Sequence, residues 1–115
     1  MTIEKFEDLI VWQKSKEFVL AINIAFSNCR DFSYKDQIWR ASISIMNNIA
    51  EGFERRSDKE FRNFLNISKG SCGEVRSMLS LAYDLKYIDS SQKTELSNKS
   101  VELSKLLMGL IRSIV

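Results

Sequence analysis

The sequence predicts an all-α fold, an antiparallel up-down-up-down four-helix bundle with no strands, and three observations support it. The 115-residue chain has no proline and only four glycines, so the strongest helix breaker is missing. Apolar residues recur at three- and four-residue steps along four long segments, as on amphipathic helices. Short polar links join these segments and fold successive helices back antiparallel.

The first helix is expected over residues 7–28. Glu7 and Asp8 near its start suit the positive end of the helix dipole. Its apolar seam contains Val11, Ser15, Phe18, Ile22, Ala25 and Cys29. A short polar stretch follows, in which Ser33 and Asp36 form a weaker capping box for the second helix.

The second helix is expected over residues 34–55 and carries two apolar lines side by side. One line contains Ile38, Ser42, Ile45 and Ile49, and the other contains Trp39, Ile43, Met46, Ala50 and Phe53. Neighbouring positions differ by about 100° around a helix, so the two lines make an apolar arc wider than one seam. Either the chain's own helices cover both lines, or a second copy of the protein covers one. The candidate contact residues between copies are Trp39, Ile43, Met46 and Phe53.

The third helix is expected over residues 58–86, after a capping box made by Ser57 and Glu60. Ser57 accepts from the backbone N–H of Glu60, and the Glu60 carboxylate accepts from the N–H of Ser57. An apolar line follows at once through Phe61, Leu65, Ser68, Cys72, Val75, Leu79 and Ala82.

The fourth helix is expected over residues 90–113, with Asp89 and Gln92 at capping-box spacing before it. Its seam contains Leu96, Ser100, Leu103, Leu107, Leu110 and Ile114. The four helices make a single domain over residues 1–115, a length that can bury one core.

Composition argues against catalytic and metal chemistry. The chain has no histidine, which zinc sites, di-iron carboxylate sites and activated nucleophiles commonly require. Cys29 and Cys72 are lone thiols on apolar faces and are read as buried small hydrophobic residues. We therefore expect no enzyme activity, no cofactor, no metal and no small-molecule substrate.

The N-terminus lacks a signal pattern, and no run approaches the roughly 18 apolar residues of a membrane span. These two observations predict a cytoplasmic protein without a membrane contact.

Asn48, Glu51 and Glu74 form a candidate interhelical network, which Gln13 or an arginine would close. Asn48 and Glu74 fall on partly apolar helical lines, and buried polar groups need partners. Such a network would fix helix register or subunit contacts. The alternative is that Glu51 and Glu74 reach water at the edge of the bundle.

Basic residues gather at the start of the third helix, although the net charge is only +2. The candidates for a nucleic-acid contact are Arg55, Arg56, Lys59, Arg62 and Lys69. Repeated around an oligomer, they would hold a phosphate backbone with strong salt dependence. No aromatic residues alternate with these basic residues to stack on bases, so binding would not depend on the nucleic-acid sequence. The alternative is a solvated face with ion pairs one turn away, such as Asp58 with Arg62.

Three segments carry a family resemblance: FEDLIVWQK near the start, QIWRASISIMNNIAEG in the middle and RRSDKEFRNFLNISKGS after it. Through them nearly the whole chain resembles the four-helix-bundle proteins encoded in intervening sequences of bacterial 23S ribosomal RNA genes. The resemblance implies a bacterial protein of unassigned role that assembles into a ring, a pentamer. More distantly, the chain is similar to accessory variability proteins of diversity-generating retroelements, basic pentameric barrels that bind nucleic acid and a reverse transcriptase.

Three residues depart from the family pattern. Trp39 stands where the family usually has arginine, which makes that surface more apolar. Met46 replaces a common proline, so any kink in the second helix should be smaller. Lys86 replaces the glycine usual before Tyr87, which weakens the expected cap of the third helix.

Two functions follow from the sequence. The first is a non-enzymatic homo-oligomer, assembled through the wide apolar face of the second helix. The alternative is an accessory protein that binds RNA or another nucleic acid through a basic edge on the third helix.

Overall fold

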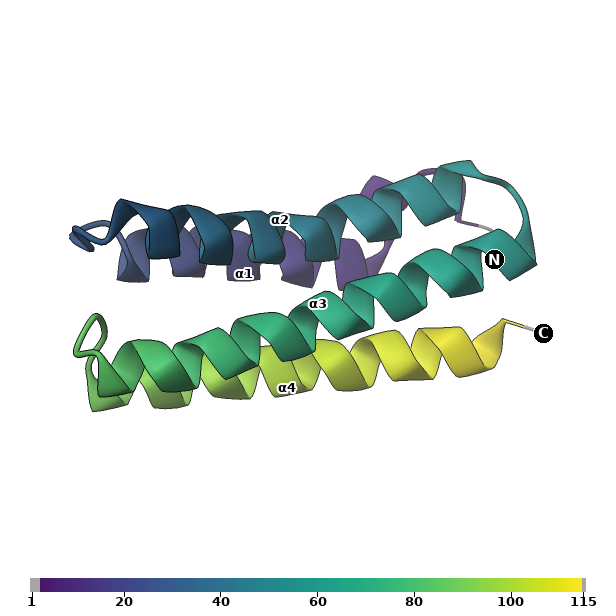
Figure 1. Cartoon of the computed structure of the whole chain (residues 1–115). Helices are drawn as coiled ribbons and strands as arrows, with labels where there is room; N and C mark the ends of the chain where they lie inside the picture. Colours follow the sequence, from purple (N-terminus) through teal and green to yellow (C-terminus); the bar gives the residue numbers. More distant parts are fainter. Residues whose placement is uncertain (1–2, 115) are drawn as a thin grey trace.

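The computed structural model describes residues 3–114 and consists of four long helices preceded by a short 3-10 turn. In chain order the elements are η1 (Phe6–Asp8), α1 (Ile10–Ala25), α2 (Phe32–Glu54), α3 (Asp58–Asp84) and α4 (Ser90–Ser113). Successive helices run antiparallel (Figure 1), and no strand occurs among the described residues. The predicted all-α up-down-up-down bundle is confirmed.

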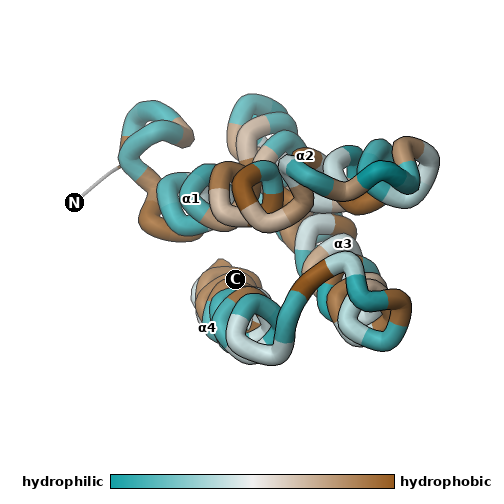
Figure 2. Tube along the Cα trace, turned by 90° about the vertical axis from the view of Figure 1, so that its left-hand side faces the viewer, coloured by the Kyte–Doolittle hydropathy of each residue, from teal (hydrophilic) through white to brown (hydrophobic). Residues whose placement is uncertain are grey.

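The four helices stand at the corners of a square when the bundle is viewed end on (Figure 2). α1 and α2 form one layer, and α3 and α4 form the other. Each helix contacts its two neighbours in the square, while within residues 3–114 the diagonal pairs make no close backbone contact. The core between the helices buries one seam from each, including Phe18, Ile45, Leu79 and Leu103.

Capping residues set the starts of α3 and α4. At α4 the predicted box is complete, with Asp89 Oδ1 accepting from the Gln92 N–H at 2.7 Å and Gln92 Oε1 accepting from the Asp89 N–H at 2.9 Å. At α3, Ser57 Oγ accepts from the Glu60 N–H at 3.4 Å. The second half of that predicted box is not formed, because the Glu60 carboxylate turns to Arg55 instead.

The start of α2 differs from the sequence prediction. Asp31, rather than Ser33 with Asp36, caps this helix, because Asp31 Oδ1 accepts from the Tyr34 N–H at 3.1 Å. The carboxylate thus satisfies one of the backbone donors that a helix start leaves free. The helix therefore begins at Phe32, slightly earlier than predicted.

The first helix is shorter than the predicted span of residues 7–28. Phe6–Asp8 winds as a separate 3-10 turn, and Leu9 is extended with ψ 128°, so α1 begins only at Ile10. The short turn packs back onto α1, where the Phe6 and Trp12 rings meet edge to face at 5.2 Å.

Two helices end on left-handed residues that are not glycine. Lys86 follows α3 with φ 67°, and Arg56 follows α2 with φ 60°. After α3, the Tyr87 N–H donates to the Ala82 carbonyl at 2.8 Å and the Lys86 N–H donates to the Tyr83 carbonyl at 3.0 Å. This is a Schellman cap, formed although lysine stands at the position that favours glycine, at a steric cost of roughly 1 kcal/mol.

Serine hydroxyls tie α3 to both of its neighbours inside the core. Ser68 Oγ donates to the Ile45 carbonyl of α2 at 2.7 Å, and Ser100 Oγ of α4 donates to the Cys72 carbonyl of α3 at 3.0 Å. Small hydroxyls let the helices pack closely, and within residues 3–114 every buried side-chain oxygen or nitrogen has a hydrogen-bond partner. Cys29 and Cys72 are buried free thiols, as predicted, and burial raises the pKa of the Cys72 thiol to about 12.

α2 and α3 approach each other very closely at Gly52. A Cβ atom on Gly52 would lie 2.6 Å from Phe64 Cβ and 3.2 Å from Phe61 Cδ1. Phe64 Cβ is bonded directly to the α3 backbone and cannot swing away. Glycine, which has no Cβ atom, is therefore the residue that allows this end of the two helices to meet.

We expect Gly52→Ala to lower the free energy of unfolding by about 1–3 kcal/mol, because the added methyl group forces α2 and α3 apart. Gly109→Ala is the matched control, since no atom lies within 4 Å of its added Cβ. This control should raise the free energy of unfolding by about 0.5–1 kcal/mol. Urea unfolding at one protein concentration measures both, and equal stability of the two variants would contradict the close approach.

Candidate functional site

The second apolar line of α2 is not enclosed by its own chain. Trp39 is 37% exposed, and Ile43, Met46 and Phe53 are half-buried. Phe32, in the first turn of the helix, is 73% exposed. We call these five residues the α2 outer line. The other line of the helix is buried, and it contains Ile38, Ser42, Ile45 and Ile49. Contact between the outer line and a second copy stays a prediction.

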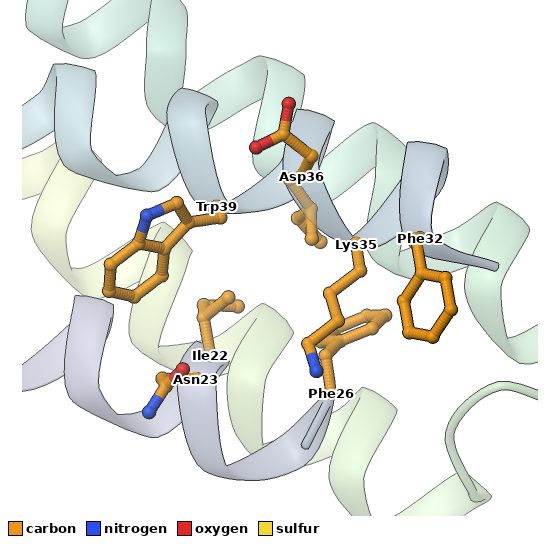
Figure 3. A pocket seen from close by; sticks show the side chains of 8 residues that line it. Ile22, Asn23, Phe26, Phe32, Lys35, Asp36 and Trp39 are labelled. Atoms are coloured by element: carbon orange, nitrogen blue, oxygen red, sulfur yellow. The ribbon is translucent and has the colours of Figure 1, made fainter. Parts of the chain in front are cut away.

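A groove of about 300 Å³ lies beside the α2 outer line, between the end of α1 and the start of α2. The buried side chains of Ile22 and Phe26 lie in it, between Trp39 at one end and Lys35 towards the other (Figure 3). Lys35 Nζ donates to the Ser27 carbonyl at 3.2 Å and so holds the end of α1. An apolar floor with a polar rim is the shape that receives an apolar side chain.

A second uncovered apolar surface follows the outward side of α3. Ile67, Leu81 and Leu85 are 45–52% exposed. Glu74 lies on the same side, exposed and without an ion pair among the described residues. We call these four residues the α3 stripe. Their seven- and four-residue spacing is visible in the sequence. The sequence analysis did not predict this surface, because it considered Glu74 as a member of a buried network.

The predicted interhelical network is not formed within the chain, and its members were Gln13, Asn48, Glu51 and Glu74. Gln13 Nε2 donates to the Glu7 carbonyl at 2.9 Å. Glu51 pairs with Arg55, one turn along its own helix, at 3.0 Å. Gln13, Glu51 and Glu74 are all exposed, so the alternative in which Glu51 and Glu74 reach water describes the single chain.

Serines make the polar contact between α2 and α3 instead. Ser44 Oγ of α2 and Ser71 Oγ of α3 are 3.0 Å apart. Asn48 Nδ2 donates to the carbonyl and the hydroxyl of Ser44 at 2.7 and 2.9 Å. Asn48 therefore supports this pair from within its own helix and does not cross to α3.

The predicted basic cluster is divided between two places. Arg55 is largely neutralised, because it pairs with Glu51 at 3.0 Å and Glu60 at 3.7 Å and lies 5.2 Å over the Phe64 ring. Arg55 and Arg56 belong to the end of α2 and the link that follows it. The remaining predicted residues belong to α3, and they are Lys59, Arg62 and Lys69.

The basic residues of α3 continue along the side that borders α4. Arg62, Lys69 and Arg76 follow each other at seven-residue spacing and so share one side of the helix. That side borders α4, because Arg62 Nη1 donates to the Ile114 carbonyl at 3.0 Å. Arg76 was not among the candidate contacts predicted from the sequence.

Lys93 of α4 extends this surface, with its ammonium 4.8 Å from the Tyr83 ring of α3. We call Arg62, Lys69, Arg76 and Lys93 the basic face. The acids inside α3 are Glu60 and Glu74, and Asp58, at its first position, lies one turn before Arg62, beyond the end of the basic face. Glu60 turns to Arg55 and Glu74 lies in the α3 stripe, so neither interrupts the basic face.

Comparison with known proteins finds the same fold in a solved structure and identifies the family. Residues 7–109 match the family described as 23S rRNA-intervening sequence protein. The chain belongs to this family. It is also similar to a crystal structure of a protein with unknown function from the S23 ribosomal protein family, from Bacteroides thetaiotaomicron. The TM-score is 0.82 at 33% sequence identity, over 89% of this chain and 98% of that chain. A search of curated proteins finds no match.

The family segments have packing and capping roles in this 23S rRNA-intervening sequence protein. Gly52 lets α2 and α3 meet, Ser57 caps α3, and Ser71 pairs with Ser44. Within residues 3–114, no three carboxylate or thiol side chains gather as metal ligands would. In the same part of the chain, no helix combines the length and the apolar character needed to cross a membrane.

At the opposite end of the bundle, this family member joins its α1–α2 and α3–α4 links through Asp31. Asp31 Oδ2 accepts from the Tyr87 hydroxyl at 2.6 Å, while Oδ1 caps α2 at Tyr34. The Tyr34 hydroxyl in turn donates to the Met78 carbonyl of α3. The hydrogen bond to Asp31 raises the pKa of Tyr87 to about 12, and the bonds from Tyr87 and Tyr34 lower the pKa of Asp31.

The Asp31–Tyr87 bond should stabilise the fold below the ordinary tyrosine pKa of 10 and be lost as pH rises through about 12. At the acid end, its contribution is present above the ordinary Asp pKa of 3.8 and is lost as pH falls through the lowered value. We expect Asp31→Asn to bring the pKa of Tyr87 back towards 10, while asparagine still caps α2.

Tyrosinate absorbance, titrated with and without Tyr87→Phe to assign the signal, measures this change. Asp84→Asn is the matched control, because that exposed carboxylate makes no hydrogen bond to Tyr87. An unchanged Tyr87 midpoint in Asp31→Asn would show that the bond is absent in solution.

Proposed function

We propose that this protein is a non-enzymatic subunit of a homo-oligomer, and that its assembly uses the face formed by α1 and α2. The observation that carries the proposal is the α2 outer line, which the chain leaves uncovered although its core is complete. Phe32 and Trp39 expose large aromatic surface beside an apolar groove. Buried aromatic side chains dominate the binding energy of protein interfaces.

The uncovered apolar residues follow continuous lines along two helices, which supports assembly better than isolated exposed residues would. The outer line, the groove and the α3 stripe together offer surface on both layers of the bundle, and stable interfaces bury roughly 1,000 Å² or more. Contacts between two different surfaces are heterologous, and they produce rings when the rotation closes. The family resemblance supports five copies as the number in the ring.

The buried free thiols support a reducing compartment, so we place the assembly in the cytoplasm. The family segments serve packing and capping in the single chain, which supports a structural role over a catalytic one. Histidine is missing from the whole sequence, which removes the commonest general base.

The second candidate function is sequence-tolerant binding of RNA or another nucleic acid, and the basic face supports it. Four cations lie along the border of α3 and α4 with no acid between them on the α3 side. Repetition around a ring would multiply this charge and raise phosphate affinity at low salt. The binding residues would then be Arg62, Lys69, Arg76 and Lys93, with Lys59 beside them, rather than the neutralised Arg55.

Trp39→Asp tests the assembly. We expect the wild-type protein to have the mass of a multiple of the 13.3 kDa chain, five copies in the favoured form, and the variant to have the mass of one chain. A charge on the buried part of an interface costs several kcal/mol when it has no partner. Ile10→Asp is the control, because Ile10 is 63% exposed but lies outside the outer line.

Light scattering at micromolar concentration gives the masses, and circular dichroism checks that both variants stay helical. A wild-type monomer would refute the assembly, and so would a Trp39→Asp variant with the wild-type mass.

A double variant, Lys69→Glu with Arg76→Glu, tests nucleic-acid binding. Fluorescence anisotropy with a structured RNA should show at least tenfold weaker binding and a salt slope reduced by about 2. The control is Lys5→Glu with Lys99→Glu, which changes the net charge equally but lies off the basic face. No binding by the wild-type protein at low salt, or equal losses in both double variants, would end this candidate.

A further inference from the structure

An aromatic side chain stands at one end of the basic face. Arg62, Lys69 and Arg76 follow each other at seven-residue spacing, and Tyr83 is one further step of seven along the same side of α3. From the first to the last of these residues the helix rises about 30 Å. The Tyr83 ring lies 4.8 Å from the Lys93 ammonium, and the residue is still 40% exposed. The basic face therefore ends on a ring that solvent reaches.

Tyr83 also lines an open hollow of about 670 Å³ at the α3–α4 link. The link lies at the same end of the bundle as the α1–α2 link (Figure 1). Buried Ile88 and the ring of Tyr87 give the hollow apolar surface. The Tyr87 hydroxyl donates to Asp31 Oδ2 at 2.6 Å, and its ring meets the Tyr34 ring edge to face at 5.3 Å. These contacts hold the Tyr87 side of the hollow in place before a ligand binds.

The charges of the hollow differ from those of the basic face. Two acidic residues, Asp84 and Asp89, line the hollow together with a single basic residue, Lys86. This excess of carboxylates disfavours a phosphate in the hollow, whereas the basic face attracts phosphates. A polynucleotide on the basic face would therefore place a base, which carries no charge, in the hollow.

We propose that the hollow receives an unpaired base of a single-stranded nucleic acid, that Tyr83 stacks on this base, and that the basic face holds the phosphates of the same strand. The inference rests on the second candidate function and identifies the form of nucleic acid that is bound. Every base has a flat π face, so stacking on Tyr83 requires no particular sequence. The site thus adds a contact with a base to a surface that otherwise contacts only the backbone.

A single strand fits this arrangement better than a duplex does. The basic side of α3 is straight over about 30 Å, and a strand of a B-form duplex makes a full turn about its axis in roughly 34 Å. Such a strand winds away from the cations, whereas a flexible single strand can follow them. A base inside a duplex is also covered by its neighbours in the stack and reaches an aromatic ring only after it is extruded.

Removal of the Tyr83 ring tests the base site. We expect Tyr83→Ala to bind a short unpaired RNA about 5- to 100-fold more weakly than the wild type, because the stacked ring is lost. The salt slope should not change, because the substitution removes no charge. Tyr83→Phe is the matched control, since it keeps the ring and should bind like the wild type. Fluorescence anisotropy measures binding, and circular dichroism checks that both variants stay helical.

The outcomes distinguish the base site from nucleic-acid binding itself. If the wild type binds the RNA but Tyr83→Ala binds equally well, the base site is overturned while the second candidate function stands. A salt slope that falls in Tyr83→Ala also overturns it, because the loss then comes from the basic face. No binding by the wild type at low salt overturns both.

A second measurement changes the nucleic acid instead of the protein. A strand of the same length without bases keeps the phosphates, and the wild type should bind it about 5- to 100-fold more weakly than the unpaired RNA. Tyr83→Ala should bind these two strands about equally, and a fully paired duplex should bind Tyr83→Ala as well as it binds the wild type. Equal binding of both strands by the wild type, or a loss of duplex affinity in Tyr83→Ala as large as the loss with the single strand, overturns the inference.

Discussion

The close packing of α2 against α3 is the constraint on which the rest of the structure depends. Gly52 lets the Phe64 side chain approach to a distance that no larger residue permits, and the Ser68 hydroxyl bonds the α2 backbone at Ile45. These contacts leave little freedom for α2 to rotate about its axis. One apolar line of α2 is thereby turned to the core and the other to the surface, so the uncovered line follows from packing elsewhere.

Much of the fold could be predicted from the sequence because its signals are local. The Asp89–Gln92 box forms as predicted, since both partners lie within one helical turn. The start of α2 could not be predicted in the same way. Asp31 caps the helix with one carboxylate oxygen, and its other oxygen accepts from Tyr87 of the distant α3–α4 link. A contact between residues so far apart leaves no trace in local spacing.

The surfaces could be predicted only in part, because a helical pattern gives the angle between residues and not the direction of the core. The two lines of α2 correctly indicated that one helix carries more apolar surface than a single seam. The same pattern left open whether Glu74 joins a buried network or reaches water; α3 turns that side outward, and Ser71 faces α2 instead. Likewise, charge counting could not reveal that Arg55 is neutralised by Glu51 and Glu60.

α3 carries its basic residues on the side towards α4 and Glu74 on the side away from α4. This separation makes the two proposed functions compatible. Arg62, Lys69 and Arg76 lie towards α4, while Glu74 and the exposed apolar residues lie on the side away from α4. A partner chain on the α3 stripe would therefore leave the basic face open to solvent. Repeating the basic face around an assembly would strengthen the positive field, so assembly should favour phosphate binding and, by thermodynamic linkage, phosphate binding should favour assembly by the same factor.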